Sequence, residues 1–166
     1  ASIPAYVLDP VMVATSGDPL LESSAVDALR SELLPLASVV TPNLHEAEIL
    51  AGMRVESETD MRRAAERILG AGPAAVLLKG GHLEGDQVVD LLLTESGERS
   101  WRSPRLPVGN AHGTGCTLSA AITAGLAAGR SLEQAVEAGI DFTRRALRTA
   151  PGLGSGATPL NHWTRP

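Results

Sequence analysis

Three short apolar runs, separated by segments with helical periodicity, constrain the fold of this chain more than any other feature. They are Tyr6–Leu8, Ala37–Thr41 and Ala74–Leu78. Continuous apolar runs of this length are typical of strands that are buried on both faces of a parallel sheet. We therefore expect an α/β fold in which a crossover helix follows each of these strands.

Amphipathic segments between and after these runs predict the helices. Over Ser57–Leu69, one face carries Met61, Ala64, Ala65, Ile68 and Leu69. Ser131 and Gln134 match the capping-box pattern S-x-x-Q at the start of a helix over Ser131–Ala150. Further predicted elements are helices at Ser23–Leu34, Asn43–Ala51 and Thr117–Ala128, a hairpin of Val88–Thr94 with Glu98–Arg105 around Ser96-Gly97, and a surface loop at Pro151–Pro166. We expect one domain over residues 1–166.

Polar residues follow the three predicted strands. Asp9 comes after the first strand, Asn43 after the second and Lys79 after the third. The carboxyl ends of parallel strands meet at one edge of a sheet, where ligands of α/β proteins bind. We therefore expect these three side chains to lie at a common site.

The residue types at this edge suit phosphate and Mg²⁺ chemistry. Glu46 lies three residues after Asn43, so both occupy one face of the predicted helix. An amide and a carboxylate, with Asp9 as a second carboxylate, are oxygen ligands of the kind that Mg²⁺ takes together with water. Lys79 offers a positive charge to a phosphate oxygen. Each residue also has an ordinary structural explanation, as a helix cap, a turn former or a surface lysine.

A second feature is the segment Gly113-Thr114-Gly115-Cys116, which leads into the predicted helix at Thr117–Ala128. A glycine-rich turn at a helix start directs backbone N–H groups outward and makes an anion site. Cys116 is the only cysteine, and a helix N-terminus favours the thiolate form of a cysteine. Its thiol is therefore a candidate base for a substrate hydroxyl, or a hydrogen-bonding group that positions the substrate while the base lies elsewhere. The alternatives are an inert core cysteine and glycines that merely connect two elements.

Composition excludes several classes of function. The net charge is −5, and the chain has only two tryptophans, one tyrosine and one phenylalanine, which argues against nucleic-acid binding. One cysteine cannot form an internal disulfide, no apolar run is long enough to span a membrane, and the start lacks a basic signal region. We expect a cytoplasmic protein. The four histidines lack zinc-ligand spacing, and no P-loop pattern occurs.

Four segments in chain order resemble one known family. They are DPVMVATSGD at Asp9–Asp18, TPNLHEAE at Thr41–Glu48, LKGGH at Leu78–His82 and HGTGCTLS at His112–Ser119. The chain resembles the hydroxymethylpyrimidine/phosphomethylpyrimidine kinases of thiamine biosynthesis, which belong to the ribokinase-like superfamily, and the likeness extends to the ending PLNHW at Pro159–Trp163. The resemblance implies a three-layer αβα fold with a mostly parallel central sheet.

The resemblance also implies roles for the residues. It implies transfer of phosphate from ATP, with Mg²⁺, to hydroxymethylpyrimidine and then to its monophosphate. Gly113, Thr114 and Gly115 would form the anion hole, and Cys116 stands where ribokinases carry an aspartate base. Asn43 and Lys79 would bind ATP phosphates, Asp9 and Glu46 would serve the metal, and Val11 would pack near the pyrimidine. Members of the family are generally homodimers.

The chain departs from the family in length. It matches about the last two-thirds of the fold, so a glycine-rich opening and much of the pyrimidine pocket are expected in a preceding segment. A first strand at Tyr6–Leu8 would otherwise expose an unpaired edge. Two alternatives remain, a pyridoxal kinase of the same superfamily and a truncated, non-catalytic nucleotide-binding module.

Overall fold

The computed structural model describes residues 5–14, 18–81, 83, 85–107, 111–153 and 156–164. Its contacts divide the chain into two compact units, Ala1–Arg105 and Leu106–Pro166, and each is described by itself. The expectation of a single domain over residues 1–166 stays a prediction. Within the described residues, no helix has the length and apolar character needed to cross a bilayer.

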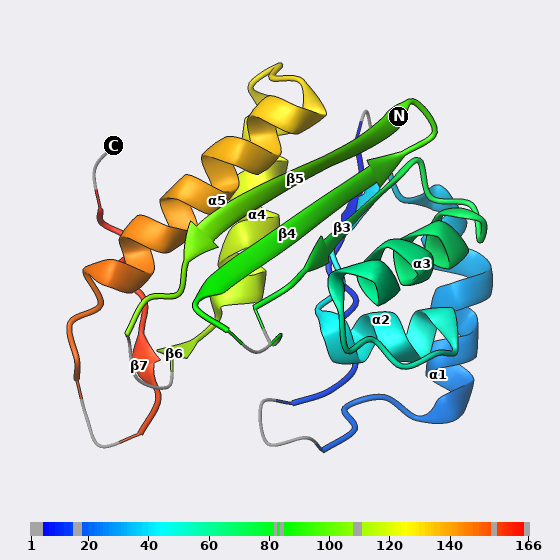
Figure 1. Ribbon diagram of the computed structural model, residues 1–166, viewed down its shortest axis with the longest axis horizontal. Coiled ribbons are helices and arrows are strands. Elements are labelled where there is room, and N and C mark those ends of the chain that lie inside the picture. The colour runs from blue at the N-terminus through cyan, green and yellow to red at the C-terminus, as the bar shows by residue number, and fades with distance from the viewer. Residues whose placement is uncertain are drawn as a thin grey trace. The chain divides into compact units, whose positions relative to one another are not determined.

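A five-stranded sheet forms the centre of the first unit, and β3, β4 and β5 lie side by side in Figure 1. The strands follow their chain order across the sheet. β1 and β2 pair in parallel, as do β2 and β3, whereas β4 runs antiparallel to both of its neighbours. β5 therefore runs in the same direction as β3. Four of the five strands share one direction, as expected of a mostly parallel sheet, although two of the four pairings are antiparallel. The bounds are β1 Val7–Leu8, β2 Val39–Val40, β3 Ala75–Lys79, β4 Gln87–Thr94 and β5 Gly97–Pro104.

Helices connect the first three strands as predicted. α1 (Ser23–Ala28) links β1 to β2, and α2 (Leu44–Ala51) with α3 (Glu58–Leu69) links β2 to β3. The helical segment that begins with α1 continues as a π turn, Leu29–Leu33, and a 3₁₀ turn, Leu34–Leu36. Pro35 lies in that last turn and has no N–H with which to extend an α-helix.

The expectation that a crossover helix also follows the third strand is wrong. β3 leads through a loop into β4, which pairs with β3 from Lys79 opposite Asp90 back to Ala75 opposite Thr94. β4 then forms the predicted hairpin with β5. A two-stranded ribbon can return along the sheet without a covering helix, because antiparallel neighbours need only a short connection.

One apolar cluster joins the sheet to the helices of this unit. It contains Val40, Val76 and Leu78 from the strands. The face predicted for α3 is confirmed, since Met61, Ala64, Ala65 and Ile68 are buried and Leu69 packs against the cluster. Each large side chain buried here contributes about 1.5–3 kcal/mol to folding. The cluster fixes the positions of β1–β3, and therefore of the residues that follow them.

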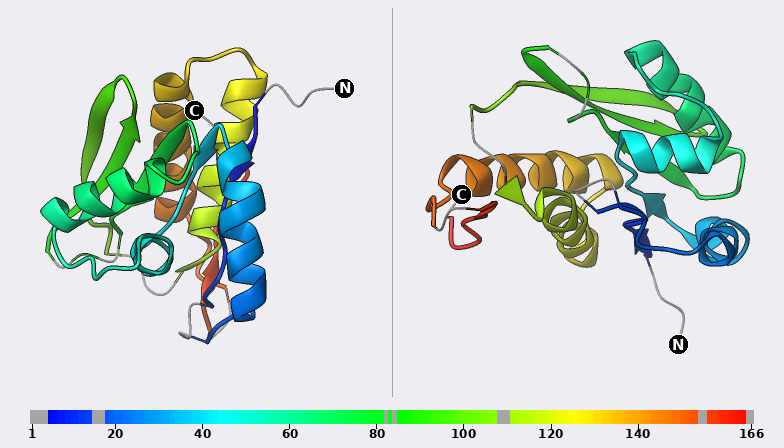
Figure 2. Two further views of the ribbon diagram at one scale, coloured as in Figure 1. Left: turned by 90° about the vertical axis from the view of Figure 1, so that its right-hand side faces the viewer. Right: turned by 90° about the horizontal axis from the view of Figure 1, so that it is seen from below.

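The second unit consists of two helices and a short strand pair. α4 (Thr114–Ala127) and α5 (Leu132–Arg148) lie side by side, as Figure 2 shows, and the predicted capping box of Ser131 and Gln134 begins α5. β6 (Ala111–His112) pairs in parallel with β7 (Thr158–Pro159). The prediction of a surface loop over Pro151–Pro166 is therefore wrong at β7 and at Leu160, which is buried.

Candidate active site

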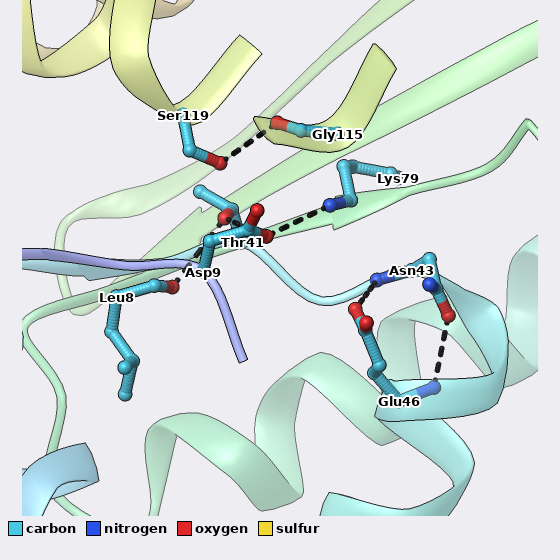
Figure 3. A network of polar contacts seen from close by, with 8 residues as sticks. All are labelled: Leu8, Asp9, Thr41, Asn43, Glu46, Lys79, Gly115 and Ser119. Atoms are coloured by element: carbon cyan, nitrogen blue, oxygen red, sulfur yellow. Dashed lines mark hydrogen bonds and ion pairs between the residues drawn. The ribbon is translucent and has the colours of Figure 1, made fainter. Parts of the chain in front are cut away.

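The carboxyl ends of β1, β2 and β3 bring three predicted residues together in the first unit. Lys79 Nζ lies 3.1 Å from Asp9 Oδ1, although 70 positions separate the two residues in the chain. Asn43 forms an isolated parallel bridge with Lys79, and the Lys79 N–H donates to the carbonyl of Pro42 at 2.9 Å. Figure 3 shows the lysine pointing toward Asp9. Parallel strand pairing thus produces the juxtaposition that the sequence predicts.

The Asp9–Lys79 pair is sheltered and has a third member. The two side chains are only 17% and 13% exposed. The Thr41 hydroxyl lies 3.1 Å from Asp9 Oδ1, to which it can donate, and 3.4 Å from the carbonyl of Leu8. Lys79 is also the only lysine of the chain. The ion pair with Asp9 therefore holds the Lys79 ammonium group at the carboxyl end of β3.

Thr41 is a site residue that the sequence-based reasoning missed. Thr41 ends the apolar run that predicts β2, so the sequence assigns it to a buried strand rather than to a site. A polar residue at the end of that run, one strand away from Asp9, is the signal that could have identified it. The residue is fully buried.

Asn43 and Glu46 begin α2 with a capping box, which Figure 3 shows as two facing hydrogen bonds. The Glu46 N–H donates to Asn43 Oδ1 at 3.0 Å, and the Asn43 N–H donates to Glu46 Oε2 at 2.8 Å. Glu46 is 3% exposed, and this burial raises the pKa of its carboxyl group. Hydrogen bonds from the backbone of Asn43 and of Met12 and the charge of Lys79 lower the pKa in part, while the charge of Asp9 raises it.

Asp9 and Glu46, the predicted metal ligands, both lie at this edge of the sheet. Among the described residues, no three Asp, Glu, His or Cys side chains gather into a group that could hold a metal ion. The charge of Asp9 acts on the Glu46 carboxyl group, so two carboxylates lie in one small region. That donor set fits Mg²⁺, which usually takes one or two protein carboxylates and completes its shell with water and phosphate oxygens.

The predicted anion turn lies in the second unit, and its helix begins earlier than expected. α4 starts at Thr114 rather than Thr117, with Gly113 as its N-cap at φ +89°. The first helical hydrogen bond runs from the Thr117 N–H to the Gly113 carbonyl at 2.9 Å. The N–H groups of Thr114, Gly115 and Cys116 therefore have no acceptor within the helix, which is the arrangement that binds anions. Gly113 adopts a left-handed conformation that other residues rarely tolerate.

Cys116 lies in the first turn of α4 and is exposed. Its thiol therefore does not lie in the core of this unit, and its role in catalysis stays a prediction. The Ser119 hydroxyl donates to the Gly115 carbonyl at 3.0 Å, and Thr117 Oγ1 lies 3.0 Å from His162 Nε2. These contacts hold the first turn of α4 from its C-terminal side.

Val11 lies in the loop that follows β1, where its N–H donates to the carbonyl of Asp9 at 2.9 Å. Its side chain is 43% exposed. His82, which ends the LKGGH segment, lies outside the described residues. The structure thus brings Asp9, Asn43, Glu46 and Lys79 to one edge, and it places Gly113–Cys116 at the start of α4. Their roles toward ATP, Mg²⁺ or a pyrimidine stay predictions.

Solved structures support the α/β, ribokinase-like fold class. Pyridoxal kinase from Staphylococcus aureus in complex with ADP matches with a TM-score of 0.89 and 35% identity, over 96% of this chain and 58% of that chain. Phosphomethylpyrimidine kinase from Clostridium difficile matches with a TM-score of 0.74 and 40% identity, over 86% of this chain and 58% of that chain.

Sequence comparison leads to one family. Hydroxymethylpyrimidine/phosphomethylpyrimidine kinase from Streptomyces coelicolor is 49% identical over 157 residues, which cover 94% of this chain and 58% of that protein. The chain therefore spans less than two thirds of the length of such relatives. The phosphomethylpyrimidine kinase family matches residues 1–161, and so nearly every residue that builds the two units described above. The chain belongs to the phosphomethylpyrimidine kinase family.

Proposed function

We propose that this chain forms the phosphate-binding part of an ATP-dependent hydroxymethylpyrimidine/phosphomethylpyrimidine kinase. The observation that carries the proposal is the sheltered Lys79–Asp9 pair, at 3.1 Å, at the carboxyl ends of the parallel strands. Such an edge is where α/β proteins bind ligands, and a lysine there suits a phosphate oxygen. Family membership supports the same reading, because relatives that match nearly the whole chain carry this name.

Phosphoryl transfer requires positioning and charge neutralisation more than covalent chemistry. Lys79 would exchange Asp9 for an oxygen of the ATP phosphates. The predicted anion hole of Gly113, Thr114 and Gly115, together with the N–H of Cys116, would hold the phosphoryl group as negative charge builds on it. Mg²⁺ bound with ATP would neutralise charge on the phosphate oxygens, with Asp9 and Glu46 as the carboxylates nearest to that task.

The acceptor is a hydroxymethyl group, whose proton must leave during transfer. The exposed Cys116 thiol at the start of α4 is our candidate for the base that removes it. Val11, exposed in the loop after β1, would pack near the pyrimidine ring. The same proposal includes a homodimer in the cytoplasm, which sedimentation analysis and cell fractionation can check.

The second candidate function is pyridoxal phosphorylation. It is favoured by the TM-scores of the pyridoxal kinase structures, which exceed that of the C. difficile phosphomethylpyrimidine kinase. Sequence identity favours phosphorylation of the pyrimidine. Two hydroxymethylpyrimidine/phosphomethylpyrimidine kinases are 49% and 51% identical to this chain, whereas the pyridoxal kinase from S. aureus is 35% identical.

Turnover of hydroxymethylpyrimidine, its monophosphate and pyridoxal, measured side by side with Mg²⁺ and ATP, separates the candidates. We expect phosphorylation of both pyrimidines at a kcat/KM well above that for pyridoxal. A clear preference for pyridoxal would overturn the pyrimidine assignment. Binding of ATP without binding of any pyrimidine would instead support a non-catalytic nucleotide-binding module.

A further inference from the structure

The loop between β3 and β4 closes around one arginine. Arg105 directly follows β5, and its guanidinium donates three hydrogen bonds to backbone carbonyls of that loop. Nε donates to Gly85 at 2.9 Å, Nη1 to Gly81 at 2.7 Å and Nη2 to Leu83 at 2.5 Å. The backbone N–H of Arg105 also donates to the carbonyl of Asp86 at 2.8 Å. Four N–H groups of Arg105 thus hold the carbonyls of Gly81, Leu83, Gly85 and Asp86.

The beginning of this loop is fixed by other contacts. The Gly80 N–H donates to Asp90 Oδ1 at 3.2 Å. Gly80 also lies so close to β4 that an added Cβ would stand 2.0 Å from the carbonyl oxygen of Val89. Leu83 packs against the apolar cluster of the first unit. Gly80 and Leu83, which follow shortly after Lys79, are thus held by β4 and by the apolar cluster.

A guanidinium suits this task better than an ammonium. Its N–H groups point in fixed directions within one plane, so three of them can meet three carbonyls at once. Arg105 is exposed, and among the described residues its guanidinium donates to backbone carbonyl oxygens. This differs from Arg102, also exposed and on β5, whose guanidinium donates to Glu58 at 2.7 and 2.5 Å.

We propose that Arg105 is a positioning residue that holds the backbone at Gly81, Leu83, Gly85 and Asp86 and thereby keeps Lys79 in place at the sheet edge. Lys79 is the last residue of β3, so the path of the loop sets the direction in which the strand end and its ammonium group point. The consequence for ATP binding rests on the proposed function. The consequences for the loop and for Lys79 do not.

The chain itself supplies the probe and the control. Lys79 is the only lysine, so an amine-acylating reagent followed by peptide mass spectrometry measures the reactivity of its side chain alone. Hydrogen exchange of the peptide that covers residues 80–86 measures the stability of the loop. The variants are Arg105→Ala and Arg105→Lys, and Arg102→Ala is the matched control because it removes another exposed guanidinium, from the adjoining strand β5.

We expect Arg105→Ala to increase loop exchange about tenfold, as the loss of several hydrogen bonds implies, and to accelerate acylation of Lys79. Arg105→Lys should resemble Arg105→Ala, since an ammonium cannot reach three carbonyls. Arg102→Ala should leave both readouts at the wild-type level. Wild-type values in Arg105→Ala, full function of the lysine variant, or an equal response of Arg102→Ala would each overturn the proposal.

Calorimetry with a non-hydrolysable ATP analogue tests whether the Arg105 contacts affect nucleotide affinity. If the wild-type protein binds it, Arg105→Ala should bind about tenfold more weakly and Arg102→Ala normally, and unchanged affinity in Arg105→Ala overturns the proposal. If the wild-type protein does not bind the analogue, the proposed function fails. The exchange and acylation results then decide the role of Arg105 by themselves.

Discussion

At the scale of single residues, Glu46 serves the fold and is a candidate for the site. Its carboxylate closes the capping box with Asn43, yet its burial raises its pKa. The ionised form is therefore disfavoured in the folded chain. The stability that protonation provides is fully present below the ordinary pKa of a glutamate, about 4.3, and is lost as the pH rises through the higher folded-state pKa.

Glu46→Gln should expose this effect. Glutamine keeps an oxygen that accepts the Asn43 N–H but cannot ionise. We expect the variant to match the wild type at acidic pH and to become relatively more stable as the pH rises toward neutrality. Glu46→Ala should lose about 1–2 kcal/mol, because the box is broken. Urea denaturation followed by circular dichroism over a pH series measures the free energies of unfolding.

The exposed capping box of Ser131 and Gln134 at the start of α5 supplies the control. Gln134→Glu places a carboxylate at a helix N-terminus in contact with solvent, where the helix dipole favours the charged form. Its stability relative to the wild type should rise with pH. A gap between Glu46→Gln and the wild type that stays constant over the pH series would contradict the burial effect.

Cys116 is the second residue with a decisive variant. Cys116→Ala should reduce turnover by about 10²–10⁴, the usual contribution of a general base, and leave ATP affinity nearly unchanged. Cys116→Ser keeps a hydrogen-bonding group without a comparable base, so recovery of turnover in this variant would identify the thiol as a positioning group. Steady-state kinetics and ATP binding provide the two readouts. Unchanged turnover in Cys116→Ala would exclude an essential role.

At the scale of elements, two adjacent glycines in the loop after β3 differ sharply in their surroundings. A Cβ at Gly80 would collide with the backbone of Val89, whereas one at Gly81 would meet nothing within 4 Å among the described residues. Gly80→Ala should therefore cost about 3 kcal/mol or more, since β4 has to move. Gly81→Ala should stay within about 0.5 kcal/mol of the wild type. Thermal and urea denaturation compare them, and equal losses would argue against the close approach.

Elements encoded by local patterns could be predicted from the sequence. The buried face of α3, the capping box of α5 and the β4–β5 hairpin each depend on residues a few positions apart, where periodicity and turn chemistry act. The meeting of Asp9 with Lys79 could be predicted because parallel strands align their carboxyl ends.

Contacts between distant segments of the chain could not be predicted. β6 and β7 are two residues each and leave no periodic pattern, so the pairing of Ala111 with Thr158 has no local signal. The acceptors of the Arg105 guanidinium are backbone carbonyls, so the residue types of that loop do not indicate the contact. The sequence predicts that this helix starts at Thr117, because the glycines at 113 and 115 are typical of a turn. Gly115 nevertheless lies in the first turn of α4, where its N–H needs no helical partner.

At the scale of the whole molecule, acidic residues exceed basic ones by 19 to 14, and arginine–glutamate pairs organise part of this charge. Arg62 contacts Glu98 at 2.5 Å, and Arg102 contacts Glu58 at 2.5 Å, so two pairs join α3 to β5. Hydrogen bonds from the arginines lower the pKa of both glutamates. The stability from these pairs is present above a pH of about 4.3 and is lost as the pH falls through the lowered folded-state values.

The double variant Glu58→Gln with Glu98→Gln should therefore be less stable than the wild type at neutral pH, with a gap that closes on acidification. Because the pairs are exposed, the gap should be small and should shrink with added salt. Unfolding free energies across pH and ionic strength test this. A gap that persists in acid would mean that the side chains stabilise the fold by packing rather than by charge.

The support of the Gly113 turn has a consequence for synthesis of the protein. Leu160 lies beside Gly113, and His162 meets Thr117 from 45 positions further along the chain. On the ribosome, the turn and α4 are thus made well before the residues that brace them. A transcript interrupted before Thr158 would yield chains with every residue of the first unit and with an unbraced turn. The order of translation therefore means that the Gly113 turn can reach its braced form only after Leu160 and His162 have been made.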